Sequence, residues 1–364
     1  MYETSLRLLQ KISSFGYKAY IIGGYPRDLY LKRSSSDVDI CTDATPMELH
    51  KIFSEIVWSS SEYGSVTVIF ENIKFEITTF RREFNYKDNR HPEKIEYVDT
   101  LEKDIVRRDF TINTLAIDKD GNRIDLLNAQ KDLDRKVIKM VGDPKIKLKE
   151  DALRILRAIR FATVLNFEIE PVLKRYIKKY GHYLRKISND VKKNELDIIF
   201  SNSNKAYGIK LILDLKLAAH LDIPELKNIK ITPSMIVTWA QLNAIHKYNF
   251  NSIEKESILK INEVKDKDIL DRNVLYRYGL YTCTMAAELK GIDKKKLNEQ
   301  FAKMPIRSKL DIALTPIEIC EILEKEAGPY LKPIIADLES KILDEKISNT
   351  KNDIENYIKE NYLK

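Results

Sequence analysis

The chain of 364 residues carries 62 Lys and Arg against 55 Asp and Glu, a net charge of +7. This length suffices for two or three domains with a substantial core, which excludes a disulfide-stapled miniprotein. Glycine and proline contribute 11 residues each, which excludes a collagen-like chain and favours helices. Residues 141–200 hold 14 basic and 8 acidic side chains, so this basic belt carries most of the excess charge. The charge is compatible with an anionic partner but does not require one.

Cysteine usage and hydropathy predict a cytoplasmic protein. Cys41, Cys283 and Cys320 are odd in number and widely spaced, as expected for reduced thiols rather than a disulfide framework or a zinc site. The sequence opens without a signal peptide, and apolar runs such as Ser65–Phe70 are far shorter than the ~20 residues that a bilayer requires. We therefore expect a soluble protein that contacts no membrane.

The first 140 residues predict an α/β domain, because short β-branched stretches alternate there with turns. Thr45-Pro46-Met47-Glu48 has the order of an N-cap, a first-turn proline and a capping-box acid. Pro26 marks the start of a helix over Arg27–Lys32 in a similar way. The predicted strands are Ala19–Gly23, Asp37–Cys41, Ser65–Phe70, Ile73–Thr79, Leu115–Ile117 and Arg123–Asp125.

From Lys147 onward the apolar residues recur with a helical period, so the rest of the chain is predicted to be helical. Breaks near residues 141–144, 201–204 and 265–272 predict four domains, at 1–140, 141–203, 204–270 and 271–364. The predicted helices include Leu148–Ala162, Pro171–Leu184, Val191–Ser201, Tyr207–Leu215 and a final polar helix, Asp353–Lys364.

The first candidate site combines two glycines with two carboxylates. Gly23 and Gly24 end a predicted strand and run into a helix, so their backbone could approach a phosphate group. Asp37 and Asp39 are two positions apart in a strand and therefore project from one face, with Val38 anchored behind them. Such adjacent charges call for a cation, and oxygen ligands without nearby His or Cys favour Mg²⁺. Each half alone also fits a plain turn or an exposed strand edge.

A second cluster adds cationic groups. Arg107 and Arg108 could clamp a triphosphate while Asp109 and Asn113 bond ribose hydroxyls, although a solvated basic turn has the same composition. Upstream, residues 82–92 have the composition of a polar loop without an apolar anchor. Such a loop is either a mobile segment that closes over a substrate or a plain surface loop.

A third cluster lies on the predicted helix Leu148–Ala162. At ~100° per residue, Asp151, Arg154 and Arg157 fall on one side of that helix, which also fits an ordinary ion pair on a solvated face. Cytosine and adenine both present an exocyclic amino donor beside a ring-nitrogen acceptor. A carboxylate next to a guanidinium would therefore suit both bases, and uracil or guanine would leave these charges unsatisfied.

Together these residues resemble the motifs of class II tRNA nucleotidyltransferases and bacterial poly(A) polymerases, within the polymerase-β superfamily. The resemblance covers about residues 15–200. Its motifs stand in the family's order: Gly23-Gly24…Arg27-Asp28, Asp37-Val38-Asp39, Thr79-Phe80-Arg81-Arg82-Glu83, Arg107-Arg108-Asp109-Phe110-Thr111-Ile112-Asn113, Gly142-Asp143-Pro144 and Glu150-Asp151-Ala152-Leu153-Arg154…Arg157-Ala158-Ile159-Arg160-Phe161.

The resemblance implies an α+β fold, in which a polymerase-β-type head with a small β-sheet (1–140) precedes an all-helical neck (141–203), body (204–270) and tail (271–364). It implies Mg²⁺ on the catalytic residues Asp37 and Asp39, with Glu76 as a weaker additional candidate. The 3′-hydroxyl of tRNA would attack CTP or ATP without a template, and pyrophosphate would leave. The residues implied to bind nucleotide are Gly23, Gly24, Arg27, Arg108, Asp109, Asn113, Asp151, Arg154, Arg157 and Arg160.

Within this family, the segment 82–92 favours a CCA-adding or an A-adding enzyme, because enzymes restricted to adding CC typically lack it. A poly(A) polymerase is a further alternative, although no basic extension is evident. A catalytically silent protein that binds the tRNA acceptor arm through the basic belt is the non-enzyme alternative. A nucleotide kinase is disfavoured because the sequence has no Gly-x-x-x-x-Gly-Lys-Ser/Thr loop. The oligomeric state is open.

Overall fold

The computed structural model describes residues 1–35, 37–60 and 64–363. The chain divides into two compact units, Met1–Lys227 and Asn228–Lys364. The boundary between them lies inside the predicted body, residues 204–270. The two units are therefore a coarser division than the four predicted domains, which stay a prediction.

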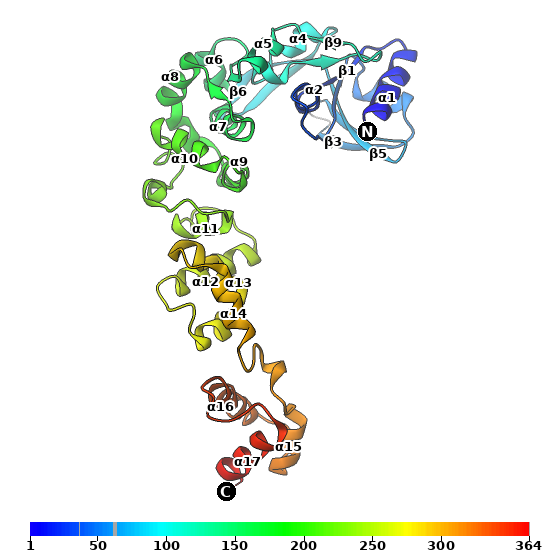
Figure 1. Ribbon diagram of the computed structural model, residues 1–364. Coiled ribbons are helices and arrows are strands. Elements are labelled where there is room, and N and C mark those ends of the chain that lie inside the picture. Colours follow the sequence, from blue (N-terminus) through cyan, green and yellow to red (C-terminus); the bar gives the residue numbers. More distant parts are fainter. Residues whose placement is uncertain (36, 61–63, 364) are drawn as a thin grey trace. The chain divides into compact units, whose positions relative to one another are not determined.

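The amino-terminal unit is built on a mixed β-sheet (Figure 1). Its strands are β1 (Ala19–Ile22), β2 (Asp39–Thr42), β3 (Ile56–Ser60), β4 (Ser65–Phe70), β5 (Ile73–Thr79), β8 (Ala116–Ile117) and β9 (Arg123–Ile124). Their order in the sheet is β3-β4-β5-β2-β1-β8-β9, and β2 and β5 run parallel whereas the other neighbours are antiparallel. β3 was not predicted. β2 begins at Asp39, two residues later than predicted, so Asp37 precedes the strand.

The alternation of side chains gives this sheet two apolar faces. Val38 and Ile40 belong to the larger core, which is covered by α1 (Tyr2–Ser14) and α3 (Pro46–Ile52). The predicted capping box at Thr45 starts α3. Cys41 belongs to a smaller core on the other face. Since alternate residues share a face, Asp39 points to the same side as Cys41, and its neighbours anchor it from behind.

Residues 82–92, predicted as a polar loop that is either mobile or a plain surface loop, belong to a β-hairpin, so the loop prediction is wrong. β6 (Arg81–Lys87) pairs with the antiparallel β7 (His91–Tyr97). Asp88 and Asn89 form the turn with φ values of 50° and 60°, a left-handed conformation that these two residue types tolerate better than most. Backbone pairing therefore orders a segment that lacks the glycine and the apolar pattern by which a hairpin is usually recognised.

The predicted single helix Leu148–Ala162 is also wrong, because it is broken at Asp151. α6 (Pro144–Glu150) ends there, and the φ of −135° and ψ of 103° at Asp151 are extended. α7 (Leu153–Leu165) starts two residues later. The Asp151 carboxylate accepts a hydrogen bond of 2.9 Å from the Leu153 N–H, so Asp151 precedes α7 instead of lying on it.

The amino-terminal unit contains further α-helices and strands. They are α2 (Gly24–Tyr30), α4 (Leu101–Ile105), α5 (Ala129–Asp134), β10 (Val137–Ile138), β11 (Glu168–Ile169), α8 (Pro171–Tyr180), α9 (Asn189–Ser201) and α10 (Lys205–Asp214). α7 contacts both α9 and α10. β10 lies in the predicted head and its parallel partner β11 lies in the predicted neck, so backbone hydrogen bonds join these two segments.

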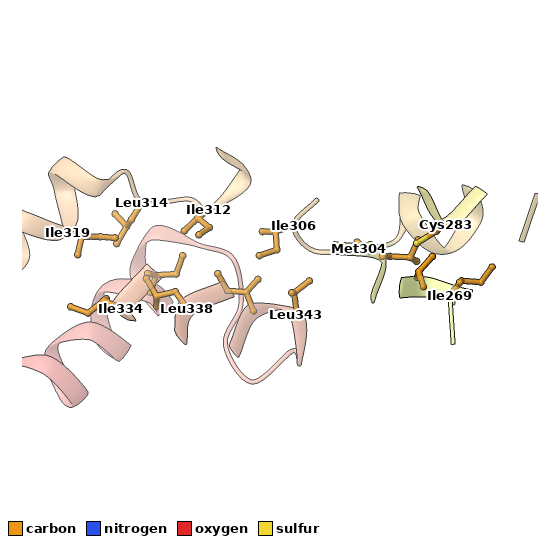
Figure 2. Close-up of a cluster of buried hydrophobic side chains, with 14 of the residues drawn as sticks. Ile269, Cys283, Met304, Ile306, Ile312, Leu314, Ile319, Ile334, Leu338 and Leu343 are labelled. Carbon is orange, nitrogen blue, oxygen red and sulfur yellow. The ribbon is translucent and has the colours of Figure 1, made fainter. Parts of the chain in front are cut away.

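The carboxy-terminal unit forms helices and connecting segments over its described residues, as predicted. The α-helices are α11 (Met235–Gln241), α12 (Ser252–Val264), α13 (Arg272–Lys290), α14 (Lys294–Ala302), α15 (Pro316–Leu323), α16 (Leu331–Leu343) and α17 (Lys351–Tyr362). One apolar cluster runs from Ile269, Cys283 and Met304 through Ile306 to Leu338 (Figure 2). The predicted α+β class is confirmed. Over the described residues, no helix is both long and apolar enough to span a bilayer.

Candidate active site

One cavity of about 540 Å³ in the amino-terminal unit gathers all the residues that were predicted to hold metal or nucleotide except Glu76, the weaker metal candidate. These residues are Gly23, Gly24, Arg27, Asp37, Asp39, Arg108, Asp109, Asn113, Asp151, Arg154, Arg157 and Arg160. They come from the region of β1 and β2, from the segment after α4, and from the α6–α7 region. Three segments that are far apart in the sequence therefore form one site, whose wall also includes Glu83, Arg107 and Phe161.

A glycine packs against one of the two carboxylates. β1 and β2 pair Ile22 with Asp39, which brings the next residue, Gly23, close to the Asp39 side chain. Gly23 has a φ of 87° and a ψ of −129°, a conformation that only glycine adopts readily. A Cβ at this position would lie 3.0 Å from Oδ2 of Asp39. Asp37 lines the same cavity from the segment before β2.

The surroundings of Asp39 favour a cation. Asp39 is open to the cavity, but the nearby protein still desolvates its carboxyl. This desolvation and the charges of Asp37 and Glu76 raise the pKa of Asp39 to about 6, while Arg108 and Arg157 act to lower it. Glu76 lies opposite Asp39 on the neighbouring strand β5. In the described part of the chain, no group of three His, Cys, Asp or Glu residues is placed to hold a metal. A cation here would need oxygen atoms from a bound molecule as well.

Arg107 and Arg108 are held by one buried carboxylate. Asp104 is completely buried and accepts hydrogen bonds from Nε of Arg107 at 2.8 Å and from Nη2 of Arg108 at 3.0 Å. Burial opposes its charged form, but the two guanidinium groups lower the pKa of Asp104. Nε of Arg108 is buried and has no hydrogen-bond partner among the described residues. An unsatisfied cationic donor at a cavity wall is typical of an anion-binding site.

Asp109 is surrounded by protein donors. Its Oδ2 accepts from Nε of Arg157 at 2.8 Å, and its Oδ1 accepts from Nδ2 of Asn113 at 3.1 Å. Asn113 in turn accepts from Nη1 of Arg27 at 2.7 Å. Burial works to raise the pKa of Asp109, but the charge of Arg157 and these hydrogen bonds lower it to about 2. Asp109 therefore orients two of the cavity's polar side chains, and its predicted bond to a ribose stays a prediction.

Asp151 and Arg154 approach each other at the break between α6 and α7. Oδ2 of Asp151 lies 3.9 Å from Nε of Arg154, beyond hydrogen-bond distance. The Arg154 side chain is 5% exposed and donates to the backbone oxygens of Lys147 and Arg107, at 3.1 Å each. The backbone thus fixes the direction of this guanidinium.

The hairpin turn holds the same break from the other side. The backbone oxygen of Asn89 accepts a hydrogen bond of 2.8 Å from the Ala152 N–H. The side-chain Nδ2 of Asn89 donates a hydrogen bond of 2.5 Å to the backbone oxygen of Lys149. These two bonds flank Asp151 on both sides along the chain. The segment 82–92 is therefore connected to the predicted base-reading residues in the structure described here.

Arg107 lines the cavity together with Arg108, the other member of the predicted arginine pair. Two further residues of the cavity wall, Glu83 and Phe161, were given no predicted role. Glu83 accepts from the Tyr86 hydroxyl at 2.6 Å and from Arg81 at 2.8 Å, contacts that the hairpin creates. Phe161 carries no polar group, so nothing in its chemistry singled it out.

Two protein-family models match the chain. Residues 19–139 match the poly A polymerase head domain, and residues 245–358 match tRNA nucleotidyltransferase domain 2. The first match contains the glycines, both aspartates and the arginine pair. Together with the cavity, these matches define the chain as a nucleotidyltransferase.

Relatives that match over nearly the whole chain show which family of nucleotidyltransferases it belongs to. The CCA-adding enzymes of Bacillus licheniformis and Ligilactobacillus salivarius are 30% and 32% identical, and the alignments cover 98% and 96% of this chain and 98% and 94% of theirs. The crystal structure of the Bacillus stearothermophilus CCA-adding enzyme in complex with CTP has a TM-score of 0.85 at 26% identity, covering 99% of this chain and 97% of that one. The chain belongs to the CCA-adding enzyme family. The Thermotoga maritima enzyme complexed with tRNA shares the fold, with a TM-score of 0.70 at 20% identity over 98% of this chain and 94% of that one.

Proposed function

We propose that this protein adds CCA to the 3′ end of tRNA from CTP and ATP, releases pyrophosphate and uses no nucleic-acid template. One observation carries the proposal: a single cavity combines a carboxylate pair, a set of arginines and an Asp–Arg pair suited to cytosine and adenine. Membership of the CCA-adding enzyme family supports it.

Asp37 and Asp39 are the proposed ligands of Mg²⁺. The fit rests on the donor set, because two carboxylates without His or Cys suit a hard cation, and on the unfavourable proximity of Asp37, Asp39 and Glu76. When bound, Mg²⁺ lowers the pKa of an attacking hydroxyl and neutralises charge that develops on phosphate oxygens. Gly23 leaves room for the Asp39 carboxylate beside the phosphate groups. Glu76 is a weaker candidate for a third Mg²⁺ ligand, and the Glu76→Gln variant tests this role.

The arginines are proposed to bind the triphosphate, and the Asp–Arg pair is proposed to select the base. Arg108 lines the cavity, and Asp104 holds its guanidinium in place. Oδ2 of Asp151 would accept from the exocyclic amino group of cytosine or adenine, while Arg154 donates to the ring nitrogen beside it. Uracil and guanine present the reverse order, so they would leave both protein groups unsatisfied.

The RNA partner is proposed to be the tRNA acceptor arm, held by the helical part of the chain. The hairpin of β6 and β7 supports complete CCA addition over CC addition alone, because its turn contacts both sides of Asp151. A cytoplasmic location is also part of the proposal. It is supported by the three cysteines, none of which forms a disulfide.

The direct test supplies the purified protein with Mg²⁺, a tRNA transcript that lacks CCA, and labelled CTP and ATP. We expect three nucleotides to be added in the order C, C, A. Products that stop at CC, products that need a CC end and gain only A, and long A tracts would each replace the proposal by another activity of the family. Binding of tRNA without any incorporation would support the catalytically silent alternative.

Variants of the carboxylates identify the catalytic residues. Asp37→Asn and Asp39→Asn are each expected to lower the rate of incorporation by roughly 10²–10⁴-fold, since they remove charge stabilisation worth several kcal/mol. Glu76→Gln should have a much smaller effect if Glu76 is not a ligand. Affinity for tRNA should be retained in all three variants. Parallel loss of tRNA binding in the Asp37 or Asp39 variants would instead indicate misfolding.

A further inference from the structure

Three arginines of the cavity surround one aromatic ring. The guanidinium carbons of Arg27, Arg157 and Arg160 lie 5.2, 5.4 and 4.4 Å from the centroid of the Phe161 ring. All four residues line the cavity. Arg27 comes from α2, whereas the other three residues come from α7. The ring is therefore the common contact of cations from two separate elements.

Phe161 is itself well fixed. It is 9% exposed and lies on α7, and its ring packs edge-on against Phe110 at a centroid distance of 5.8 Å. Phe110 is completely buried. The ring thus has a rigid support on the side of Phe110, and its position does not depend on the arginines alone.

Each arginine also has a carboxylate partner of its own. Arg27 pairs with Asp28 at 2.9 Å and Arg157 with Asp109 at 2.7 Å. For Arg160, Nε lies 3.0 Å from Oε2 of Glu195, but the two atoms are not aligned as a hydrogen bond.

The arginines nevertheless repel one another. Burial is the largest influence that lowers the pKa of Arg160, and the charges of Arg157 and Arg27 lower it further, although Glu195 and Asp109 oppose them. Burial opposes the charged form of Arg157, but the charges of Asp109 and Glu195 raise its pKa. Arg160 is therefore the arginine that most needs a neighbour that stabilises positive charge without consuming hydrogen-bond donors.

An aromatic face meets that need. The ring quadrupole attracts a cation over its face, with an energy that grows when the pair is removed from water. The ring accepts no conventional hydrogen bond, so it uses none of the arginine N–H groups that Asp28, Asn113 and Asp109 leave for phosphate oxygens. A leucine in the same place would fill part of the volume and supply no such attraction.

We propose that Phe161 is a positioning residue for phosphate binding: its ring holds Arg27, Arg157 and Arg160 together so that their charges converge on the triphosphate and on the departing pyrophosphate. This inference rests on the proposed function, because it concerns the same cavity. Phe161 acts through the arginines and makes no contact with the base in this account.

The test uses inorganic pyrophosphate, which has no base or ribose. Its binding to the whole protein in the presence of Mg²⁺ is measured by calorimetry for the wild type, Phe161→Leu and Phe161→Tyr. We expect Phe161→Leu to weaken pyrophosphate binding by about tenfold, and Phe161→Tyr, which keeps the ring, to restore most of the affinity. Because the measurement needs no turnover, it stays informative even if the protein adds nucleotides other than CCA.

Steady-state kinetics provide the second readout. Phe161→Leu should raise KM for CTP and for ATP by similar factors, with kcat changed less than threefold. Phe75→Leu is the control, since Phe75 is also a buried phenylalanine, 1% exposed against 9% for Phe161, but belongs to the core that α1 and α3 cover and does not line the cavity. This control should lower thermal stability and leave pyrophosphate affinity unchanged.

Two results would overturn the proposal. If Phe161→Leu raises KM for the nucleotides but leaves pyrophosphate affinity unchanged, the ring contacts the base or the ribose instead of acting through the arginines. If Phe161→Leu and Phe75→Leu lower thermal stability alike and neither changes pyrophosphate affinity, Phe161 only packs the interior.

Discussion

Arg157 places two nitrogens on a single oxygen of Asp109. Nε lies 2.8 Å and Nη2 lies 2.7 Å from Oδ2, and the other carboxylate oxygen accepts from the Phe110 N–H at 2.7 Å. The contact joins α7 to the segment that follows the arginine pair. The Arg157–Asp109 ion pair fixes the direction of the Arg157 guanidinium, which lines the proposed nucleotide site. The strength of this ion pair therefore affects both the stability of the fold and the binding of substrate.

The low pKa of Asp109 predicts a specific acid sensitivity. Its folded-state pKa of about 2 lies below the ordinary value of 3.8. The contribution of the charged Asp109 carboxylate to the free energy of unfolding is therefore complete above about pH 4 and is lost as the pH falls toward 2. We expect the gap in free energy of unfolding between the wild type and Asp109→Asn to narrow by about 2 kcal/mol between pH 5 and pH 2. Chemical denaturation of both proteins over this range measures it, and a gap that does not change with pH would contradict the prediction.

The repulsion between Asp37 and Asp39 predicts that the metal-free protein gains stability when one charge is removed. Asp39→Asn should unfold about 2–4 °C above the wild type in EDTA, which corresponds to about 1 kcal/mol after allowance for solvent screening. When Mg²⁺ and CTP are added, the unfolding temperature of the wild type should rise more than that of Asp39→Asn. Calorimetry checks both conditions, with the exposed Asp120→Asn as a control for a surface charge. A lower unfolding temperature for Asp39→Asn in EDTA would rule out net repulsion.

Asp151→Asn should alter the choice of base. The amide oxygen can still accept from the Leu153 N–H, as Oδ1 of the carboxylate does. The amide NH₂ would then replace the carboxylate oxygen that is proposed to accept from the base, and would meet the amino group of cytosine or adenine, donor against donor.

We expect kcat/KM for CTP and ATP to fall by about 10–100-fold and incorporation of UTP to rise relative to CTP, since one unsatisfied buried group costs about 1–3 kcal/mol. Incorporation of each of the four nucleotides measures the change. Asp214→Asn, an exposed position at the end of α10, is the matched control and should behave as the wild type. An equal loss for all four nucleotides would mean that Asp151 does not read the base.

The sequence predicted best what depends on local pattern. The strands Ser65–Phe70 and Ile73–Thr79 have their predicted bounds, because apolar residues alternate along them and Glu71 and Asn72 adopt the positive φ of a tight turn. The Thr45 capping box forms as predicted, since all its donors and acceptors lie within four residues.

The errors arose where distant contacts decide the structure. The periodicity of Leu148–Ala162 continues through Asp151, and the helix nevertheless breaks where the hairpin turn takes the Ala152 N–H as a donor to Asn89. The hairpin is itself joined to distant residues, because Glu83 lies 3.5 Å from the guanidinium of Arg107. Neither contact has a local signature. The motifs predicted which residues line the cavity, but the arrangement of arginines around Phe161 depends on a contact between Arg27 of α2 and a ring on α7.

A comparison of Gly23→Ala with Gly16→Ala separates the effect of backbone strain at a positive φ from the effect of a Cβ contact with Asp39. Gly23→Ala places a Cβ at a φ of 87° and 3.0 Å from Oδ2 of Asp39, whereas Gly16→Ala places one at a φ of 90° with no atom within 4 Å. Both variants therefore carry backbone strain of about 1–3 kcal/mol, but only Gly23→Ala displaces the carboxylate. We expect similar losses of thermal stability and, in Gly23→Ala alone, a fall in kcat of at least about tenfold that higher Mg²⁺ partly restores. Equal kcat values for the two variants would show that the space beside Asp39 is not needed for the reaction.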